Sequence, residues 1–294
     1  MTETEATTGM FDGVHRGHRD LIAALTARAA ETGRRPIVFT FDRHPLELIR
    51  LESAPRLLMP VDRRVETIRA LGVDDVRVIH FDETMRALDA ASFINLLHIC
   101  HNVTEIVMGF NHRFGSDRLT DRDDYRRAAA SSGVGLVFPP EYRLADGSPV
   151  SSSIVRQALA CGDAARASEL LGRPYRIEGT VVHGQKIGCT IGFPTANIKP
   201  REPRQLVPLN GVYAADVTVD GATHRSMLNI GRRPTVGNEG PISIEANIIG
   251  FVGDLYGRDV AVDFVARLRD ERRFDSLDEL AAQLAADRTA AIKA

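Results

Sequence analysis

The sequence predicts an α/β domain built on a doubly wound parallel sheet, followed by a small antiparallel β-barrel with a terminal helix. Three observations carry this prediction. The chain has 294 residues, which is enough for two hydrophobic cores. Up to residue 172, continuous apolar runs alternate with segments of helical periodicity, as is typical of a parallel sheet. Beyond residue 172 the apolar period changes to two, so we expect domains at 1–172 and 173–294.

Composition and charge limit the partners that the chain is expected to bind. The chain is 44% hydrophobic and 26% charged, and its net charge of −2 favours neither nucleic acid nor a membrane surface. The N-terminus is acidic and lacks the apolar core of a signal peptide, and no apolar run reaches bilayer length. Cys100, Cys161 and Cys189 are odd in number and far apart. They argue against disulfides and fit a reducing, cytoplasmic environment.

The first motif is GMFDGVHRGH at residues 9–18, directly before a helical pattern of apolar residues. His15 and His18 therefore fall at the start of a helix, where free backbone N–H groups and the macrodipole favour an anion. Gly17 lets a phosphate approach the backbone. Imidazole N–H groups can stabilise charge that grows on phosphorus. A zinc site is disfavoured because a third ligand and a carboxylate are lacking nearby.

The first half continues as alternating strands and helices. Before Gly9 only a short Ala-Thr-Thr stretch precedes the motif, so we expect the first strand to be short or frayed. The following patterns predict strands at 36–41, 76–81, 104–109 and 135–138, and helices at 61–71, 91–100 and 123–131. This order gives the doubly wound sheet.

Polar residues follow two of these strands. Asp42 and His44 come after the strand at 36–41, and Asn111 lies in a glycine-bracketed loop after the strand at 104–109. Open α/β sheets bind ligands at the carboxyl ends of their strands, so all three are candidates for ligand contact. The alternatives are a solvated His44 and an Asn111 that serves only the turn.

Three serines precede a helical pattern near the end of the first half. Ser151, Ser152 and Ser153 are followed by Arg156, one turn into the helix. The serines are explained by helix capping alone, and equally by a phosphate held by their hydroxyl and N–H groups. The guanidinium of Arg156 fits phosphate oxygens.

The second half predicts strands at 175–182, 211–219, 223–230, 242–251 and 260–265, and a closing helix after Ser276. Its motif is GFPTAN at 192–197, where Thr195 and Asn197 offer oxygens suited to a Mg²⁺ held largely by phosphates. From composition alone this is an ordinary turn at Pro194. Glu245 shares a strand face with Ser243 and Asn247, and a solvated carboxylate would look the same.

The residues 11–18 resemble the signature of the nucleotidylyltransferase superfamily and, more narrowly, that of the bifunctional bacterial riboflavin kinase/FMN adenylyltransferase family. GFPTAN resembles the signature of riboflavin kinases. The resemblance spans nearly the whole chain. It implies a Rossmann-like first domain that transfers AMP from ATP to FMN, and a barrel that phosphorylates riboflavin with ATP and Mg²⁺.

The resemblance also implies roles for individual residues. It implies that His15, His18 and Arg156 assist adenylyl transfer and that Glu245 is the general base of the kinase. Thr195 and Asn197 would hold the metal. Contacts to nucleotide or flavin are implied for Gly9, Phe11, Asp12, Gly13, Gly17, Asp42, His44, Asn111, Ser151, Ser152, Ser153, Gly184, Gly188, Pro194, Thr195, Asn197, Arg269 and Phe274. The chain departs from the family at Ile154, Cys189 and Gly250, where a basic residue, an arginine and an acidic residue are usual.

We therefore expect a bifunctional enzyme of FAD synthesis whose partners are riboflavin, FMN and ATP. The pattern is also compatible with one active half-reaction only, or with a flavin-binding regulator that has no turnover. We expect a monomer or a weak homo-oligomer.

Overall fold

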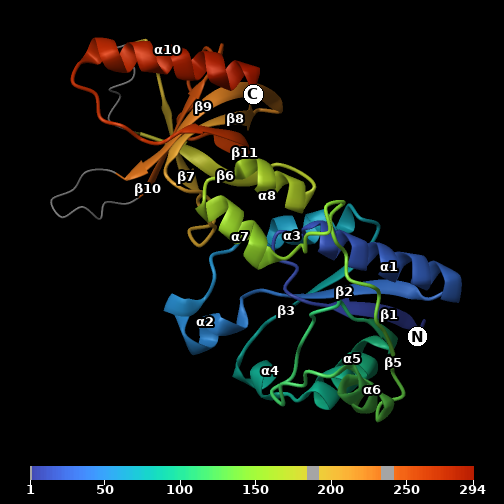
Figure 1. The fold of residues 1–294 in the computed structure, drawn as a ribbon. Coiled ribbons are helices and arrows are strands. Elements are labelled where there is room, and N and C mark those ends of the chain that lie inside the picture. The colour runs from blue at the N-terminus through green and yellow to red at the C-terminus, as the bar shows by residue number, and fades with distance from the viewer. Residues whose placement is uncertain (1, 184–191, 233–241) are drawn as a thin grey trace. The chain divides into compact units, whose positions relative to one another are not determined.

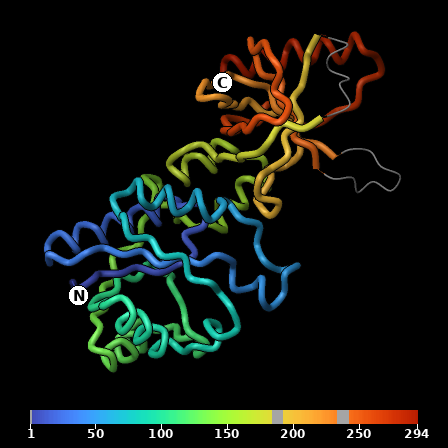
Figure 2. Tube along the Cα trace, turned by 180° about the vertical axis from the view of Figure 1, so that it is seen from behind, coloured from blue at the N-terminus to red at the C-terminus, as the bar shows by residue number. Residues whose placement is uncertain are grey.

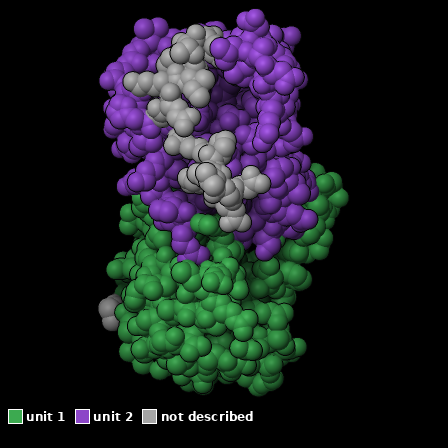
Figure 3. Space-filling model, turned by 90° about the vertical axis from the view of Figure 1, so that its left-hand side faces the viewer, with its two compact units in different colours: residues 1–151 green, residues 152–294 purple. Residues whose placement is uncertain are grey.

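In a computed structural model, the chain forms two compact units, residues 1–151 and 152–294 (Figures 1 and 3). The structure describes residues 2–183, 192–232 and 242–294. Gly184, Gly188 and Cys189, which the sequence analysis singled out, lie outside the described residues.

Unit 1 is a five-stranded parallel sheet with helices on both faces. The strand order is β3-β2-β1-β4-β5. The strands are β1 Thr4–Thr8, β2 Arg35–Phe41, β3 Asp75–Ile79, β4 Val103–Val107 and β5 Gly135–Val137. The helices are α1 Arg16–Thr32, α2 Pro45–Ile49, the 3-10 turn η1 Leu51–Ser53, α3 Val61–Arg69, α4 Glu83–Ala87, α5 Ala90–His101 and α6 Arg122–Ala130.

Two apolar clusters cover the two faces of this sheet. Leu25 of α1 and Ile68 of α3 belong to one cluster with Val38 of β2. Phe93 of α5 and Tyr125 of α6 belong to the other. Figure 1 shows α1 and α3 on one side of the strands and α5 and α6 on the other. The prediction of a doubly wound parallel sheet is confirmed.

The first strand is intact, so the expectation of a frayed strand is wrong. All five residues of β1 are buried, and β1 pairs with β2 on one side and β4 on the other. Two of its threonines bond to neighbouring backbone: Thr4 Oγ1 donates to His101 O at 2.9 Å and Thr7 Oγ1 to Val107 O at 2.8 Å. A central position in the sheet satisfies the backbone on both sides, which outweighs the low apolar content.

A buried carboxylate also lies in β1. Glu5 is fully buried and lies 3.5 Å from both Arg28 and Arg34. Arg28 Nη2 donates to Glu105 Oε2 of β4 at 2.9 Å. Burial, followed by the neighbouring Glu105, raises the pKa of Glu5, whereas the hydrogen bond from Arg28 lowers the pKa of Glu105. The two carboxyl groups therefore divide the charge unequally.

Unit 2 is a closed antiparallel barrel, which confirms the predicted architecture. Its strands follow the order β10-β7-β6-β11-β8-β9. Its strands are β6 Tyr175–Val182, β7 Ala196–Pro200, β8 Gly211–Val219, β9 Ala222–Arg232, β10 Ile242–Ile248 and β11 Asp259–Arg269. Its helices are α7 Ser152–Ala160, α8 Ala164–Leu171 and α10 Leu277–Lys293. Helix α8 packs on β6 and β11, and α10 packs on β8 and β9 (Figures 1 and 2).

The structure differs from the predicted elements in a few places. Helices α2 and α4 have five residues each and were not expected from the apolar pattern. Strand β7 was not predicted either, and it begins within the GFPTAN motif, at Ala196. Strand β10 ends at Ile248, three residues before the predicted end, and Gly250 then adopts a left-handed φ of 75°.

Candidate active sites

The loop between β1 and α1 is tightly wound. Phe11, Gly13 and Val14 all have positive φ angles, of 45°, 79° and 39°. Val14 N donates to Phe11 O at 2.9 Å, and both side chains are buried. A β-branched residue in the left-handed region is strained, and such strain persists where the surrounding structure holds it. The buried Phe11 and Val14 therefore fix the path of the chain into the two histidines.

His15 and His18 form one unit at the start of α1. His15 is the N-cap, and its Nδ1 accepts a hydrogen bond from His18 N at 3.2 Å. The two rings stack with centroids 3.6 Å apart and an interplanar angle of 16°. Because Nδ1 accepts, the neutral His15 ring carries its proton on Nε2. The helix start thus presents an imidazole N–H beside its own backbone N–H groups.

The charge of His18 is suppressed. Burial, and then the neighbouring His15, Arg64 and His112, lower the pKa of His18 well below its ordinary value. Its Nδ1 is buried and has no hydrogen-bond partner among the residues that the structure describes. An anion at this place would favour the protonated ring. The arrangement is therefore suited to a phosphate ligand.

Gly17 lies in a closely packed place beside the His15 ring. A Cβ at this position would lie 3.3 Å from His15 Cε1 and 3.6 Å from Val150 O. The chain that leads to Ser151 therefore passes directly beside the loop. A Cβ at Gly9 would meet the Phe11 ring at 3.4 Å, which is ordinary contact.

Asp12 and Asp42 make structural hydrogen bonds. Asp12 is buried and accepts from the backbone N of Leu58 at 3.0 Å and of Met59 at 3.2 Å. Asp42 accepts from Phe81 N at 3.0 Å and lies 2.6 Å from His80 Nδ1. Burial alone would raise the pKa of Asp42, but these hydrogen bonds outweigh it and lower the pKa. Both carboxylates tie loops together at the carboxyl end of the sheet.

His44 and Asn111 lie in loops at that same end. His44 caps the short helix α2: its Nδ1 accepts from Leu46 N at 3.1 Å, and its backbone N donates to Glu47 Oε1 at 3.0 Å. Asn111 is exposed in the loop after β4.

The serine motif spans the division between the two units. Ser151 is the last residue of unit 1, and Ser152 is the first residue of α7 in unit 2. Ser153 is exposed, while Ile154 and Arg156 are half-buried on the first turns of α7.

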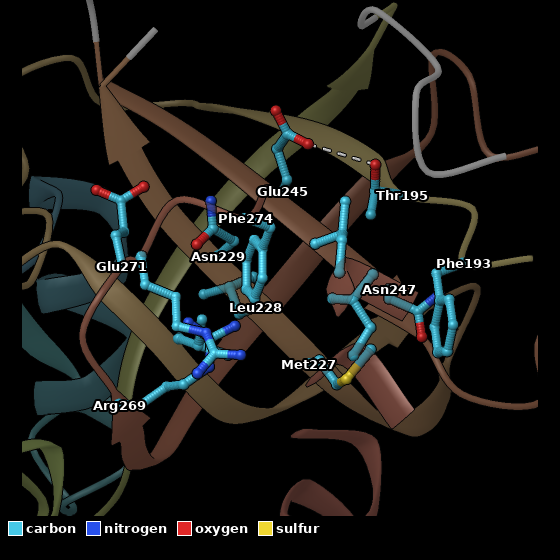
Figure 4. A pocket seen from close by; sticks show the side chains of 14 residues that line it. Phe193, Thr195, Met227, Leu228, Asn229, Glu245, Asn247, Arg269, Glu271 and Phe274 are labelled. Carbon is cyan, nitrogen blue, oxygen red and sulfur yellow. Dashed lines mark hydrogen bonds between the residues drawn. The ribbon is translucent and has the colours of Figure 1, made fainter. Parts of the chain in front are cut away.

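Unit 2 holds a pocket of about 310 Å³ between the barrel and α10 (Figure 4). Its apolar wall is formed by Phe193, Val212, Met227, Leu228, Phe274, Leu280 and Leu284. Its polar side chains are Thr195, Asn229, Glu245, Asn247, Arg269, Glu271 and Arg272. An apolar cavity with a few convergent polar groups is typical of a small-molecule site.

The GFPTAN motif and Glu245 meet in this pocket. Thr195 Oγ1 donates to Glu245 Oε2 at 3.4 Å, as the dashed line in Figure 4 shows. In the sheet, Glu245 is paired with Asn197 of β7 on one side and with Asn229 of β9 on the other. Asn247 Nδ2 donates to Pro194 O at 2.8 Å and so fixes the motif against β10. The motif and the carboxylate are thus held by neighbouring strands.

Arg269 and Phe274 lie on the other side of the pocket. Arg269 Nη2 bonds to Asp287 Oδ2 at 2.6 Å, and Asp287 is buried on α10. The guanidinium carbon of Arg269 lies 5.9 Å from the centre of the Phe274 ring, and that of Arg272 lies 4.6 Å from it. This ion pair anchors the segment that borders the pocket.

Asp287 and Asn229 were not predicted. Asp287 continues the apolar stripe of α10 one turn after Leu284, so a charged residue on a buried face was the available signal. Asn229 carries no such signal, because only the closure of the barrel brings it to the pocket.

The fold and the two sites are typical of a two-domain enzyme that binds nucleotides. One domain is an α/β unit with a histidine pair at a helix start, and the other is a barrel with a carboxylate in an apolar pocket. Known protein families match the same two parts of the chain. The FAD synthetase family model matches residues 1–154, and the riboflavin kinase family model matches residues 171–294. The chain belongs to the bifunctional riboflavin kinase/FMN adenylyltransferase family.

Relatives extend over nearly the whole chain. The bifunctional riboflavin kinase/FMN adenylyltransferase of Pseudomonas fluorescens is 41% identical over 287 residues, covering 97% of this chain and 91% of the relative. That of Escherichia coli K12 is 39% identical, covering 96% and 89%. A crystal structure described as a macrolide-efflux protein from Streptococcus pneumoniae superimposes with a TM-score of 0.86 at 32% identity, covering 98% and 93%. In the part of the chain that the structure describes, the helices are too short or too polar to cross a membrane.

Proposed function

We propose that the chain performs two consecutive transfers, riboflavin to FMN and FMN to FAD, each in its own domain. The adenylyltransferase domain is residues 1–172 and the kinase domain is residues 173–294. Gly172 supports this boundary, because it ends α8 in a left-handed conformation shortly before the barrel begins at Tyr175. Family membership over the full length supports the presence of both activities.

In the kinase domain, Glu245 acts as the general base. It accepts the proton of the ribityl 5′-hydroxyl while that oxygen forms a bond to the γ-phosphorus of ATP and the bond to ADP breaks. The observation that carries this proposal is the position of Glu245, in an apolar pocket and within 3.4 Å of Thr195 Oγ1. Phe274 and Leu228 offer apolar surface to the flavin ring.

Mg²⁺ fits this site as a cation shared with ATP. Thr195 supplies a hydroxyl and Asn197 an amide oxygen, next to the carboxylate of Glu245. These hard oxygen donors are few, as expected for a cation held mainly by phosphates and water. When bound, the cation neutralises charge on the phosphate oxygens.

In the adenylyltransferase domain, a phosphate oxygen of FMN attacks the α-phosphorus of ATP, and pyrophosphate leaves. The nucleophile belongs to the substrate, so the protein positions the reactants and stabilises charge. His15 and His18 act at the start of α1, and Arg156 acts from α7 with the serines 151–153. The stacked, capped geometry of the two histidines supports this role.

The test is product analysis by chromatography after incubation of the purified chain with riboflavin, ATP and Mg²⁺. We expect both FMN and FAD. If FMN alone forms, the first domain is inactive toward FMN. If no product forms from either riboflavin or FMN, the chain is a binding protein rather than an enzyme.

The setting we propose is cytoplasmic, and the chain is a monomer or a weak homo-oligomer. The exposed free thiols of Cys100 and Cys161 support a reducing compartment. Light scattering coupled to size-exclusion chromatography measures the oligomeric state.

A further inference from the structure

A buried arginine lies beneath the carboxyl end of the parallel sheet. Arg64 is on α3, and its side chain is fully buried. Its Nη1 donates to Phe41 O at 2.8 Å and to Thr40 Oγ1 at 3.1 Å, where β2 ends. Thr40 Oγ1 in turn donates to Met10 O at 3.2 Å. Arg64 is thus connected through one hydroxyl to the loop that leads into His15.

The rest of the Arg64 guanidinium lacks hydrogen bonds within residues 2–183, 192–232 and 242–294. Its Nε and Nη2 are buried and have no hydrogen-bond partner among the described residues. The carboxylates of Asp12 and Glu47 are near enough to favour its charge, although burial outweighs them. A buried cation without a paired anion is costly. This cost suggests that a ligand supplies the missing negative charge.

The free donors around His18 belong to three different segments. Burial, and then the neighbouring His15, Arg64 and His112, lower the pKa of His18, so these groups lie around one place. The Nδ1 atoms of His18 and His112 are buried and, like two nitrogens of Arg64, have no partner within the described residues. Three segments thus bring buried, unpartnered nitrogen atoms and the charge of Arg64 together near the start of α1.

We propose that Arg64 is a positioning residue for adenylyl transfer. It holds the β1–α1 loop through Thr40, and it supplies a fixed positive charge for the triphosphate of ATP. The inference rests on the proposed function of the first domain. It adds a residue outside the FDGVHRGH motif to that site.

The test compares Arg64→Met with Arg63→Met. Arg63 is the neighbouring residue on α3, and its side chain is half-buried and paired with Glu66. For Arg64→Met we expect kcat for FAD formation from FMN to fall roughly 10- to 100-fold and KM for ATP to rise, with KM for FMN unchanged. Arg63→Met should match the wild type. FMN formation from riboflavin should be unchanged in both variants.

Two further measurements separate charge from mere packing. Arg64→Lys keeps the positive charge and should restore a large part of the lost activity. Loss of the Arg64 charge should also move the limb of the rate–pH profile that reports His18 to higher pH in Arg64→Met, and not in Arg63→Met.

The following outcomes would overturn the role of Arg64 or the proposed function on which it rests. Equal FAD formation by Arg64→Met and Arg63→Met overturns the proposal. So does an Arg64→Lys variant as impaired as Arg64→Met with an unmoved pH profile, because the role is then structural. If the wild-type chain makes no FAD from FMN, the proposed function has failed. Calorimetric titration with ATP alone then still tests Arg64, and equal ATP affinity in the two methionine variants overturns it.

Discussion

The two sites differ in how their charged side chains are paired within the protein. Around His18 lie the imidazoles of His15 and His112 and the guanidinium of Arg64, and several of their buried nitrogen atoms have no hydrogen-bond partner among the described residues. In the pocket of unit 2, Arg269 is already neutralised by Asp287, and Glu245 already accepts from Thr195. The first site therefore suits an anionic ligand. The second combines carboxylates and arginines with a mostly apolar wall and suits an uncharged ring system such as riboflavin.

The largest effect that would sharpen this comparison is expected from Glu245→Gln. It removes the proposed base, so FMN formation should fall by about 10²–10⁴-fold, while conversion of FMN to FAD is unchanged. Ser243→Ala is a matched control, because Ser243 lies on the same face of β10 and bonds to Gly231 O instead. An unchanged kinase rate in Glu245→Gln would remove this residue from the mechanism.

The corresponding change in unit 1 is His18→Ala. It should lower FAD formation from FMN by roughly 2–4 kcal/mol of transition-state stabilisation and leave FMN formation intact. Initial rates of both half-reactions measure this. Loss of both activities would contradict a local role and indicate misfolding.

A third prediction concerns pH and the positive character of the first site. Burial lowers the pKa of His112 to about 4. In the unfolded chain His112 therefore binds a proton near pH 6.5, whereas in the folded chain it stays neutral down to about pH 4. The free energy of unfolding consequently falls between pH 6.5 and 4 by up to about 3 kcal/mol. His112→Phe should flatten this dependence in denaturant unfolding followed across that range. An unaltered pH dependence would show that His112 is protonated in the folded protein.

The smallest effect tests the ion cluster at β1. The pKa of Glu5 is raised, so ionisation of Glu5 lowers the free energy of unfolding as pH rises above 4.5. The pKa of Glu105 is lowered, so ionised Glu105 stabilises the folded chain, and this stabilisation is lost as pH falls. At pH 7, Glu105→Gln should therefore destabilise unit 1 by about 1 kcal/mol, and Glu5→Gln by less. Unfolding free energies measure both, and the reverse order would contradict the assignment of the charge to Glu105.

Local signals predicted much of the fold and part of the sites. The helix after His15 and the barrel strands follow from short-range apolar periods, and GFPTAN and Glu245 share the pocket. Arg64 and Asp287 escaped prediction because their roles arise from partners on other elements, 24 and 18 residues away for Thr40 and Arg269. β1 escaped as well, since its burial depends on neighbours rather than on its own composition.

The polar character of β1 has a consequence during synthesis. The Thr7 hydroxyl donates a hydrogen bond to Val107 O of β4, which follows it by 100 residues. At about 5–20 residues per second, the strand waits roughly 5–20 s after its translation before β4 exists. An apolar strand exposed for so long invites aggregation, whereas threonines and a glutamate keep this segment solvated until both neighbours are made. The central strand of the sheet is therefore also the strand whose composition protects it from aggregation before its second neighbour has been synthesised.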